Sequence, residues 1–406
     1  MMAYAELENL RDSWKGEICI FGAGQIGKGK AFEIIKNIGF DVNFYCDNYI
    51  SEGTIVKDSL RIRDVQYLYD HNEDVLVFLC VSVKYQEQII RQLKEHKVKN
   101  IVSMEVSDSY IAQIMEEVDK ADDSVKRKWH AFYDDVEFLS PIFKKRTGYD
   151  LDINDPKTFN EKLQWLKLHD QNPTYTQMVD KYAVKKYIAE KVGEEYVIPT
   201  LGVFDTFDEI EFEKLPQQFV LKCTHDSGSV VICQNKDNFD KVKAREILES
   251  RLGINYYWLG REWPYKNVQR RIIVEKYMAA TCDMIDYKFM CFHGEPKIVF
   301  TCTERFEQTG LKVTFFDLDW NKLDFERYYP ASEKEIAKPQ NLELMIEIAT
   351  RLSEGIPFVR VDLYEIEGRV YFGEMTFSPG GGMEDFRPVE WDYVLGSWIN
   401  IDCGVK

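Results

Sequence analysis

Two carboxylates and an arginine near the end of the chain have spacings that suit metal-assisted chemistry. Asp362 follows Arg360 by two residues in one alternating run, and Glu374 precedes Thr376 by two residues in the next. Successive strand side chains point to opposite faces, so each pair should share one face of its strand. A Glu-Gly pair at 367–368 favours a tight turn, and we therefore predict a hairpin that brings the two carboxylates together.

Such a hairpin would carry a metal and a nucleotide. Adjacent carboxylates repel unless a cation lies between them, and Mg²⁺ binds one or two carboxylates together with nucleotide phosphates. Gly380 and Gly381, after the second strand, would let backbone N–H groups approach an anion closely. These runs alone leave open an ordinary surface hairpin with solvated acidic residues.

A lysine inside an apolar strand predicts a bound anion. Lys222 lies in the run 219–223, and a buried lysine is costly without a counter-charge. The loop that follows contains Ser227, Gly228 and Ser229. This composition fits a mobile flap that closes over phosphates. A plain hairpin loop beside a lysine that extends to solvent is the alternative.

The segments before the hairpin supply further charged positions. Residues 270–278 form a strand that contains Glu275 and Tyr277, and alternation places Asp286 and Lys288 on one face of the next strand. Upstream, Thr158-x-x-Glu161 is a capping box that opens a helix. A second helix, from about 176 to 192, carries Lys181 near its start, where we interpret it as an ordinary solvated charge.

Residues 1–105 have the pattern of a Rossmann-like α/β unit. Gly22, Gly24 and Gly27 form G-x-G-x-x-G directly after a strand, and Asp47 follows about 20 residues later. A helix N-terminus there could hold a phosphate. The unit is short for a complete dinucleotide fold, so NAD, another nucleotide or nucleotide-sugar, and no ligand all remain open.

Length and charge limit the class of protein. A chain of 406 residues suggests two or three domains, and 106–155 is predicted as a helical linker region. The 52 basic and 69 acidic residues give a net charge of −17, which disfavours nucleic acid as a partner. No run approaches the ~18 apolar residues of a membrane span, and the first residues do not resemble a secretory signal. We expect a cytoplasmic protein with no stable membrane insertion and an undetermined oligomeric state.

The nine cysteines are interpreted as small hydrophobic residues. None belongs to a Cys-x-x-Cys pair, and several lie in apolar, strand-like runs. We therefore expect neither disulfides nor a zinc site.

The order of these motifs over residues 130–400 resembles the TupA-like ATP-grasp family of bacterial surface-polysaccharide gene clusters. The resemblance implies an ATP-grasp fold at 156–406, with two α+β subdomains that clasp ATP. The segments that carry it are Phe159-Asn-Glu-Lys-Leu-Gln-Trp165, Asp180-Lys-Tyr182, Phe219-Val-Leu-Lys222, Asp286-Tyr-Lys-Phe289 and Phe372-Gly-Glu-Met-Thr-Phe377.

The resemblance also implies roles for individual residues. Lys222 would hold the α- and β-phosphates with help from Lys181 and the flap, Glu275 and Tyr277 would line the adenine pocket, and Asp286 would reach the ribose. Asp362 and Glu374 would bind Mg²⁺, and Thr376, where many ATP-grasp enzymes have Asn, would be a weaker ligand that leaves the metal count open.

The implied reaction is the ATP-dependent joining of a carboxylate to an amine. The carboxylate attacks the γ-phosphate, with Arg360 and Lys288 among the catalytic groups, and an amine then displaces phosphate to give an amide. Arg360 with the Gly380 and Gly381 backbone would stabilise the oxyanion. By family analogy, the carboxylate would belong to a uronic acid or an amino acid, with a nucleotide- or lipid-linked sugar as a further candidate, and the nucleophile would be an amino acid or amino-alcohol. A small-molecule or sugar kinase and a non-catalytic nucleotide-binding scaffold are the alternatives.

Overall fold

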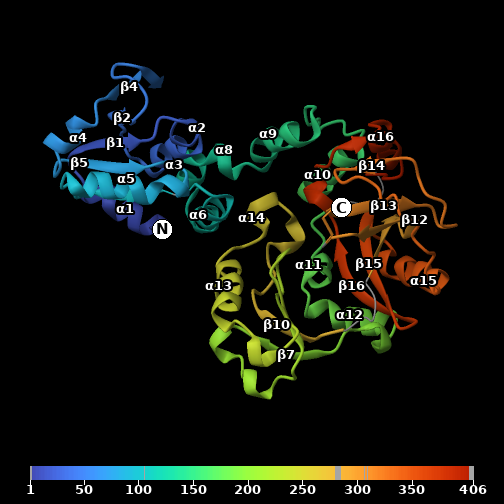
Figure 1. Ribbon diagram of the computed structural model, residues 1–406. Helices are drawn as coiled ribbons and strands as arrows, with labels where there is room; N and C mark the ends of the chain where they lie inside the picture. The colour runs from blue at the N-terminus through green and yellow to red at the C-terminus, as the bar shows by residue number, and fades with distance from the viewer. Residues whose placement is uncertain (1, 105, 279–284, 306, 309, 402–406) are drawn as a thin grey trace. The chain divides into compact units, whose positions relative to one another are not determined.

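The N-terminal unit extends to residue 133. The computed structural model describes residues 2–104, 106–278, 285–305, 307–308 and 310–401 (Figure 1), and the chain divides into Met1–Tyr133 and Asp134–Lys406. This single division replaces the predicted boundaries at 105 and 155. The helices between 106 and 133 belong to the first unit, where the fully buried Trp129 contacts the ring of Tyr4 with centroids 5.8 Å apart.

The first unit contains the open parallel sheet that the sequence predicts. Its strand order is β3-β4-β2-β1-β5-β6, with parallel pairing throughout except between β3 and β4. β1 and β5 are almost entirely apolar because both faces of a parallel sheet are covered by helices. Cys19 and Phe21 face the side of Leu68 and Leu93, whereas Tyr45 faces Phe32 on the other side.

Its elements are α1 (Tyr4–Ser13), β1 (Glu17–Phe21), α2 (Gln25–Lys28), α3 (Lys30–Ile38), β2 (Phe44–Cys46), β3 (Ile55–Lys57), β4 (Leu60–Arg63), α4 (Gln66–Asp70), β5 (Val75–Leu79), α5 (Val83–Glu95), β6 (Ile101–Ser103), α6 (Asp108–Lys120), α7 (Asp123–Lys128) and α8 (His130–Tyr133).

The glycine motif of this unit is explained largely by packing. A side chain at Gly22 would lie 2.7 Å from the Cys80 carbonyl, and one at Gly27 would lie 1.7 Å from the Gly22 carbonyl. The carboxylate of Asp47 accepts backbone N–H groups of Ala23 and Tyr49, both at 2.9 Å. The carboxylate of Asp47 therefore stabilises the turns next to it in the structure.

The second unit contains two antiparallel sheets. The first has the order β7-β10-β8-β9, and α13 packs on it through Ala244 and Leu248. The second has the order β13-β12-β11-β15-β16, and α15 covers it through residues such as Met345 and Leu352. A two-stranded sheet, β14-β17, lies beside Phe325 and Phe386. A parallel α/β unit followed by paired antiparallel sheets with helices is the fold class that we expected.

Its elements are α9 (Asp135–Thr147), α10 (Phe159–His169), α11 (Thr174–Val179), α12 (Ala183–Lys191), β7 (Thr200–Phe204), β8 (Phe219–Cys223), β9 (Val230–Cys233), α13 (Lys241–Leu252), α14 (Tyr257–Gly260), β10 (Ile272–Lys276), β11 (Asp286–Phe292), β12 (Glu295–Thr303), β13 (Lys312–Phe316), β14 (Glu326–Arg327), α15 (Leu342–Ser353), β15 (Phe358–Ile366), β16 (Arg369–Thr376), β17 (Phe386–Arg387) and α16 (Glu390–Ser397), with short 3-10 helices that include η5 (Trp263–Tyr265) and η6 (Pro379–Gly382).

The predicted capping box is confirmed. The Thr158 hydroxyl accepts the Glu161 N–H at 3.1 Å and the Glu161 carboxylate accepts the Thr158 N–H at 3.0 Å, which is the capping box of α10. The seven cysteines of the described residues are all free, and six of them are buried. Over the same residues, no helix is long and apolar enough to cross a membrane.

Candidate functional site

The predicted hairpin forms one wall of the site. β15 and β16 pair with Asp362 opposite Glu374 and with Arg360 opposite Thr376. The turn residues at 367–368 have φ of +53° and +72°, as a two-residue hairpin turn requires. The predicted hairpin and the predicted proximity of Asp362 and Glu374 are therefore confirmed.

Arg360 bridges the two carboxylates. Its Nε donates to Asp362 Oδ1 at 2.6 Å, and its Nη2 lies 2.7 Å from both Asp362 Oδ2 and Glu374 Oε1. Lys288, on the neighbouring strand β11, also donates to Asp362. Asp362 is 1 % exposed, whereas the Glu374 side chain is 42 % exposed. Asp362 is thus the buried counter-charge of two cations, and Glu374 is the carboxylate that faces outward.

The charge states of this group follow from their mutual attraction. Burial opposes the ionisation of Glu374, but Arg360 and Lys288 lower its pKa to about 2. Burial likewise opposes the charge of Lys288, yet Asp362 raises the pKa of that lysine above its ordinary value. Burial raises the pKa of Asp362, although the charges of Arg360 and Lys288 oppose this rise.

The residues present fit a magnesium ion that also binds phosphate. A guanidinium nitrogen of Arg360 occupies the position between Asp362 and Glu374, so this nitrogen would have to move aside for Mg²⁺ to contact both carboxylates. The hydroxyl of Thr376 lies 3.3 Å from Glu374 Oε1 and would add a neutral oxygen. Within the described ranges, no cluster of three or more His, Cys, Asp or Glu side chains forms a complete metal site. Phosphate oxygens would have to complete the coordination of Mg²⁺.

A cleft of about 370 Å³ lies beside the hairpin and collects most of the predicted residues. Its lining includes the predicted Lys181, Lys222, Ser227, Gly228, Glu275, Asp286, Lys288, Arg360 and Glu374, together with residues that the sequence did not single out, among them Lys185, Arg305 and Tyr364. Both antiparallel sheets of the second unit contribute to it.

The sequence predicts an anion beside Lys222, and in the structure the carboxylate of Glu275 is that anion. The Lys222 Nζ lies 2.7 Å from one carboxylate oxygen of Glu275, and the Lys185 Nζ lies 2.5 Å from the other. Burial opposes the charge of Glu275, but the two lysines lower its pKa. Lys185 is one helical turn beyond Lys181, a spacing that could have revealed it.

Lys181 reaches the cleft because the predicted helix 176–192 is broken. α11 ends at 179 and α12 begins at 183, and the Asp180 carboxylate accepts the N–H groups of Tyr182 and Ala183 at 2.8 and 3.1 Å. The Lys181 ammonium donates to the backbone carbonyl of Asp226. The interpretation of Lys181 as a solvated helix charge is therefore wrong.

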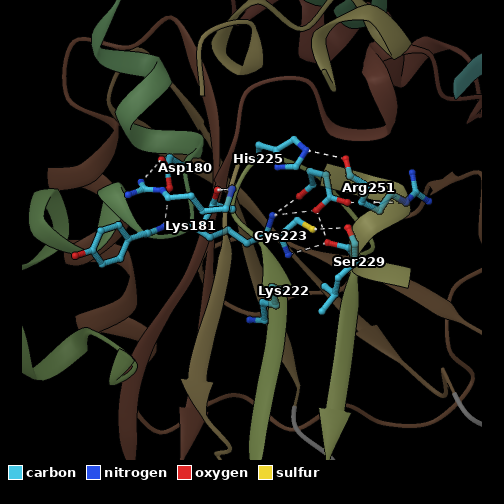
Figure 2. A network of polar contacts seen from close by, with 12 residues as sticks. Asp180, Lys181, Lys222, Cys223, His225, Ser229 and Arg251 are labelled. Carbon is cyan, nitrogen blue, oxygen red and sulfur yellow. Dashed lines mark hydrogen bonds and ion pairs between the residues drawn. The ribbon is translucent and has the colours of Figure 1, made fainter. Parts of the chain in front are cut away.

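Polar contacts anchor the loop after Lys222 (Figure 2). The Ser229 hydroxyl donates to Asp226 at 2.5 Å and accepts the Cys223 N–H at 3.0 Å. One ring nitrogen of His225 lies 3.1 Å from the Arg251 carbonyl. Ser227 and Gly228 are exposed and line the cleft, whereas Ser229 is 2 % exposed and points inward. Ser229 thus stabilises the loop, which corrects its predicted contact with the nucleotide.

The predicted metal ligands Asp362 and Thr376 do not line the cleft, and neither do Gly380, Gly381 and Tyr277. The Gly381 N–H donates to the Ser378 carbonyl at 2.9 Å, and the Gly381 carbonyl accepts the Lys167 ammonium at 2.5 Å. This loop presents carbonyls to a cation, so its geometry does not support the predicted oxyanion contact of Gly380 and Gly381. The Tyr277 hydroxyl accepts a hydrogen bond from Gln234 at 3.3 Å and is likewise outside the cleft lining.

Comparisons with known proteins identify one family and several solved structures that are similar to this chain. The profile of a family described as TupA-like ATPgrasp matches residues 161–400. A solved D-alanine–D-alanine ligase from Bacillus anthracis complexed with ATP is 13 % identical, with a TM-score of 0.30 over 89 % of this chain and 86 % of that chain. The D-alanine–D-alanine ligase from Helicobacter pylori is 12 % identical, with a TM-score of 0.29 over 95 % of this chain and 100 % of that chain. The ATP-grasp ligase PsnB, complexed with minimal precursor, Mg and ADP, is 6 % identical, with a TM-score of 0.28 over 90 % of each chain. No curated protein matches the sequence.

Proposed function

This chain belongs to the TupA-like ATP-grasp family and is an ATP-dependent ligase, and we propose that it joins an amino acid or amine to a uronic acid of a bacterial capsular or surface polysaccharide. The observation that carries the proposal is the cleft itself. Six cationic and three acidic side chains line it, in a chain whose net charge is −17. A local excess of positive charge beside a carboxylate pair suits a nucleotide triphosphate and a carboxylate substrate.

The residues of the chain would share the first step as follows. Lys222 and Lys181 bind the phosphates, and the exposed backbone of Ser227 and Gly228 closes over them. Asp362 and Glu374 would hold Mg²⁺, which when bound neutralises phosphate oxygens. Arg360 screens the approach of the substrate carboxylate to the γ-phosphate. A carboxylate oxygen forms a bond to phosphorus, ADP leaves with the electron pair, and an acyl phosphate results.

The second step forms the amide. A neutral amine attacks the acyl carbon, and phosphate then leaves with the electrons of the carbon–oxygen bond. The amine nitrogen gives up its extra proton as the amide forms. Arg360, fixed by three hydrogen bonds to the two carboxylates, would stabilise the negative oxygen of the tetrahedral intermediate.

Hydroxylamine trapping tests the proposal without knowledge of the natural amine. The protein is incubated with ATP, Mg²⁺, hydroxylamine and a panel of uronic acids, both free and as UDP-sugars. A ligase that forms an acyl phosphate gives a hydroxamate and ADP in equal amounts. A kinase gives a stable phosphorylated sugar and no hydroxamate, and a binding scaffold gives no ADP. Either of these last two outcomes would refute the ligase assignment.

A further inference from the structure

An acidic side chain outside the nucleotide cleft lies buried and unpaired near the hairpin. Glu262 follows α14 and precedes η5, and it is 7 % exposed. Its carboxylate makes no hydrogen bond and no ion pair within 4 Å to any side chain or backbone group of the described residues. An isolated buried carboxylate is costly to fold around. Groups of this kind are typical of binding and catalytic sites.

The one buried lysine in its neighbourhood does not bond to it. The Lys167 ammonium donates to Gln164 Oε1 at 3.0 Å, to the Gly260 carbonyl at 3.0 Å and to the Gly381 carbonyl at 2.5 Å. An ammonium has three donors, so Lys167 has none left for Glu262. The charge of Lys167 therefore favours the ionised form of Glu262, but Lys167 donates no hydrogen bond to the Glu262 carboxylate oxygens.

Glu262 interacts electrostatically with Arg360 and Glu374, two side chains of the proposed reaction centre. Burial raises the pKa of Glu262 to about 7, with Lys167 and Arg360 opposing the rise and Glu374 adding to it. α11 packs against both η5 and β16, so the segment that follows Glu262 and the strand that carries Glu374 have one helix as a common neighbour. Glu262 therefore lies within electrostatic reach of the site where the acyl phosphate would form.

Two tyrosines lie in the same region. The rings of Tyr256 and Tyr265 pack edge to face with centroids 4.8 Å apart. Burial raises the pKa of both phenols, and the charges of Glu262 and Glu374 add to the rise in each case. The Tyr265 N–H donates to the backbone carbonyl of Glu262 at 3.1 Å, so the Tyr256–Tyr265 pair starts from the same turn as Glu262.

The turn before Glu262 is built to fix its position. Arg261 is fully buried in a left-handed conformation with φ of +56°. Its Nε lies 2.8 Å from an Asp135 oxygen, and its Nη1 donates to the Trp258 carbonyl at 2.8 Å. A positive φ at arginine is unfavourable unless its surroundings hold it. The strained residue Arg261 directly precedes Glu262, so the contacts that hold Arg261 also fix the backbone position of Glu262.

We propose that Glu262 binds the ammonium group of the acceptor substrate and that Tyr256 and Tyr265 form the aromatic wall of this subsite. This inference rests on the proposed ligase function and adds the chemical class of the acceptor, a primary amine that is cationic in solution. The ammonium would supply the charge-assisted hydrogen bonds that Glu262 lacks. Aromatic faces attract the same cation. The Glu262 carboxylate would then accept one proton from the ammonium, which leaves the neutral amine that attacks the acyl carbon.

The test compares a neutral and a cationic nucleophile in the full-length protein. Hydroxylamine is neutral at pH 7.5 and needs no carboxylate to bind it, so Glu262→Gln should form hydroxamate at the wild-type rate. With ethanolamine or amino acids as acceptors, the same variant should show a KM for the amine at least about tenfold higher, because one partner of a charge pair is lost. The KM for ATP should not change. Glu262→Asp should recover part of the loss, and Glu249→Gln, at an exposed helix position, serves as the control.

Each outcome decides the matter. An amine KM that is equal in Glu262→Gln and wild type would overturn the inference. The inference would also be overturned if neither ethanolamine nor any of the amino acids inhibited hydroxamate formation by wild type, because a bound ammonium should compete with hydroxylamine. A lower melting temperature of Glu262→Gln with equal losses toward both nucleophiles would make Glu262 structural. A wild type that forms no hydroxamate would instead refute the proposed function, and with it the inference.

Discussion

Replacing Asp362 by Asn should destabilise the second unit as well as abolish ATP turnover. Asp362 is 1 % exposed and is bonded to both Arg360 and Lys288. The amide keeps the shape but leaves two buried cations with one counter-charge fewer. Breaking a buried pair from one side typically costs 3–5 kcal/mol, and the amide oxygen retains one hydrogen bond, so we expect a loss of about 3 kcal/mol in the free energy of unfolding.

Glu374→Gln is the matched control on the opposite strand. Its carboxylate also contacts Arg360, at 2.7 Å, but its side chain is 42 % exposed. Solvent screens such a pair, and the expected loss of stability is less than about 1 kcal/mol. Both variants should lose ATP turnover. The two changes should therefore agree in activity and differ in stability.

Urea unfolding of the full-length variants measures this difference, and hydrogen exchange of the peptides that contain β15 and β16 locates it. Adding Lys288→Met to Asp362→Asn removes one of the unpaired cations, so the double variant should regain part of the lost stability. Equal stability of Asp362→Asn and wild type, within about 0.5 kcal/mol, would refute the assignment of Asp362 as a buried counter-charge.

The other predictions concern the cleft and the N-terminal unit. Lys222→Met should weaken binding of a non-hydrolysable ATP analogue by a few kcal/mol, as calorimetry would show, and unchanged affinity would remove Lys222 from the phosphate site. Ser229→Ala should lower the melting temperature but leave the affinity for the same analogue unchanged, because its hydroxyl bonds only within the loop; weaker binding without destabilisation would contradict this. Because the pKa of Glu262 is raised to about 7 in the folded protein, the free energy of unfolding of wild type should fall by up to about 3 kcal/mol as the pH rises from 4.5 to 7. Glu262→Gln should not show this fall, and urea unfolding over the same pH range would measure the difference. Parallel pH profiles of the two proteins would disprove the raised pKa. The full-length protein should show no saturable thermal shift with millimolar NAD or NADP, since Asp47 bonds its own turn; a shift that Gly24→Val abolishes would reopen the dinucleotide hypothesis.

The sequence by itself determined the elements that depend on near neighbours. The alternation of residues 358–376 and the Glu-Gly turn predicted the hairpin and the opposition of Asp362 and Glu374, because strand periodicity and turn chemistry act within a few residues. The apolar strand around Lys222 demanded an anion for the same local reason. The family resemblance added ATP as the ligand of this region.

The tertiary structure alone decided which groups pair across long separations. Glycine 381 was predicted to face an anion, but its carbonyl accepts Lys167, 214 residues away in the chain. The anion beside Lys222 proved to be Glu275 on an adjacent strand, with Lys185 from a helix on its other side. Composition cannot show whether a serine such as Ser229 points into a cleft or into its own loop.

Glu262 gives the physical reason most clearly. In the sequence it is one acidic residue among 69, with nothing in its spacing to mark it. Glu262 is notable because its side chain is buried and because the nearby Lys167 donates its hydrogen bonds to other groups. Both features depend on chain segments that meet only in the folded protein. A residue's type and local pattern set what it can bond to, but packing sets what remains for it to bond.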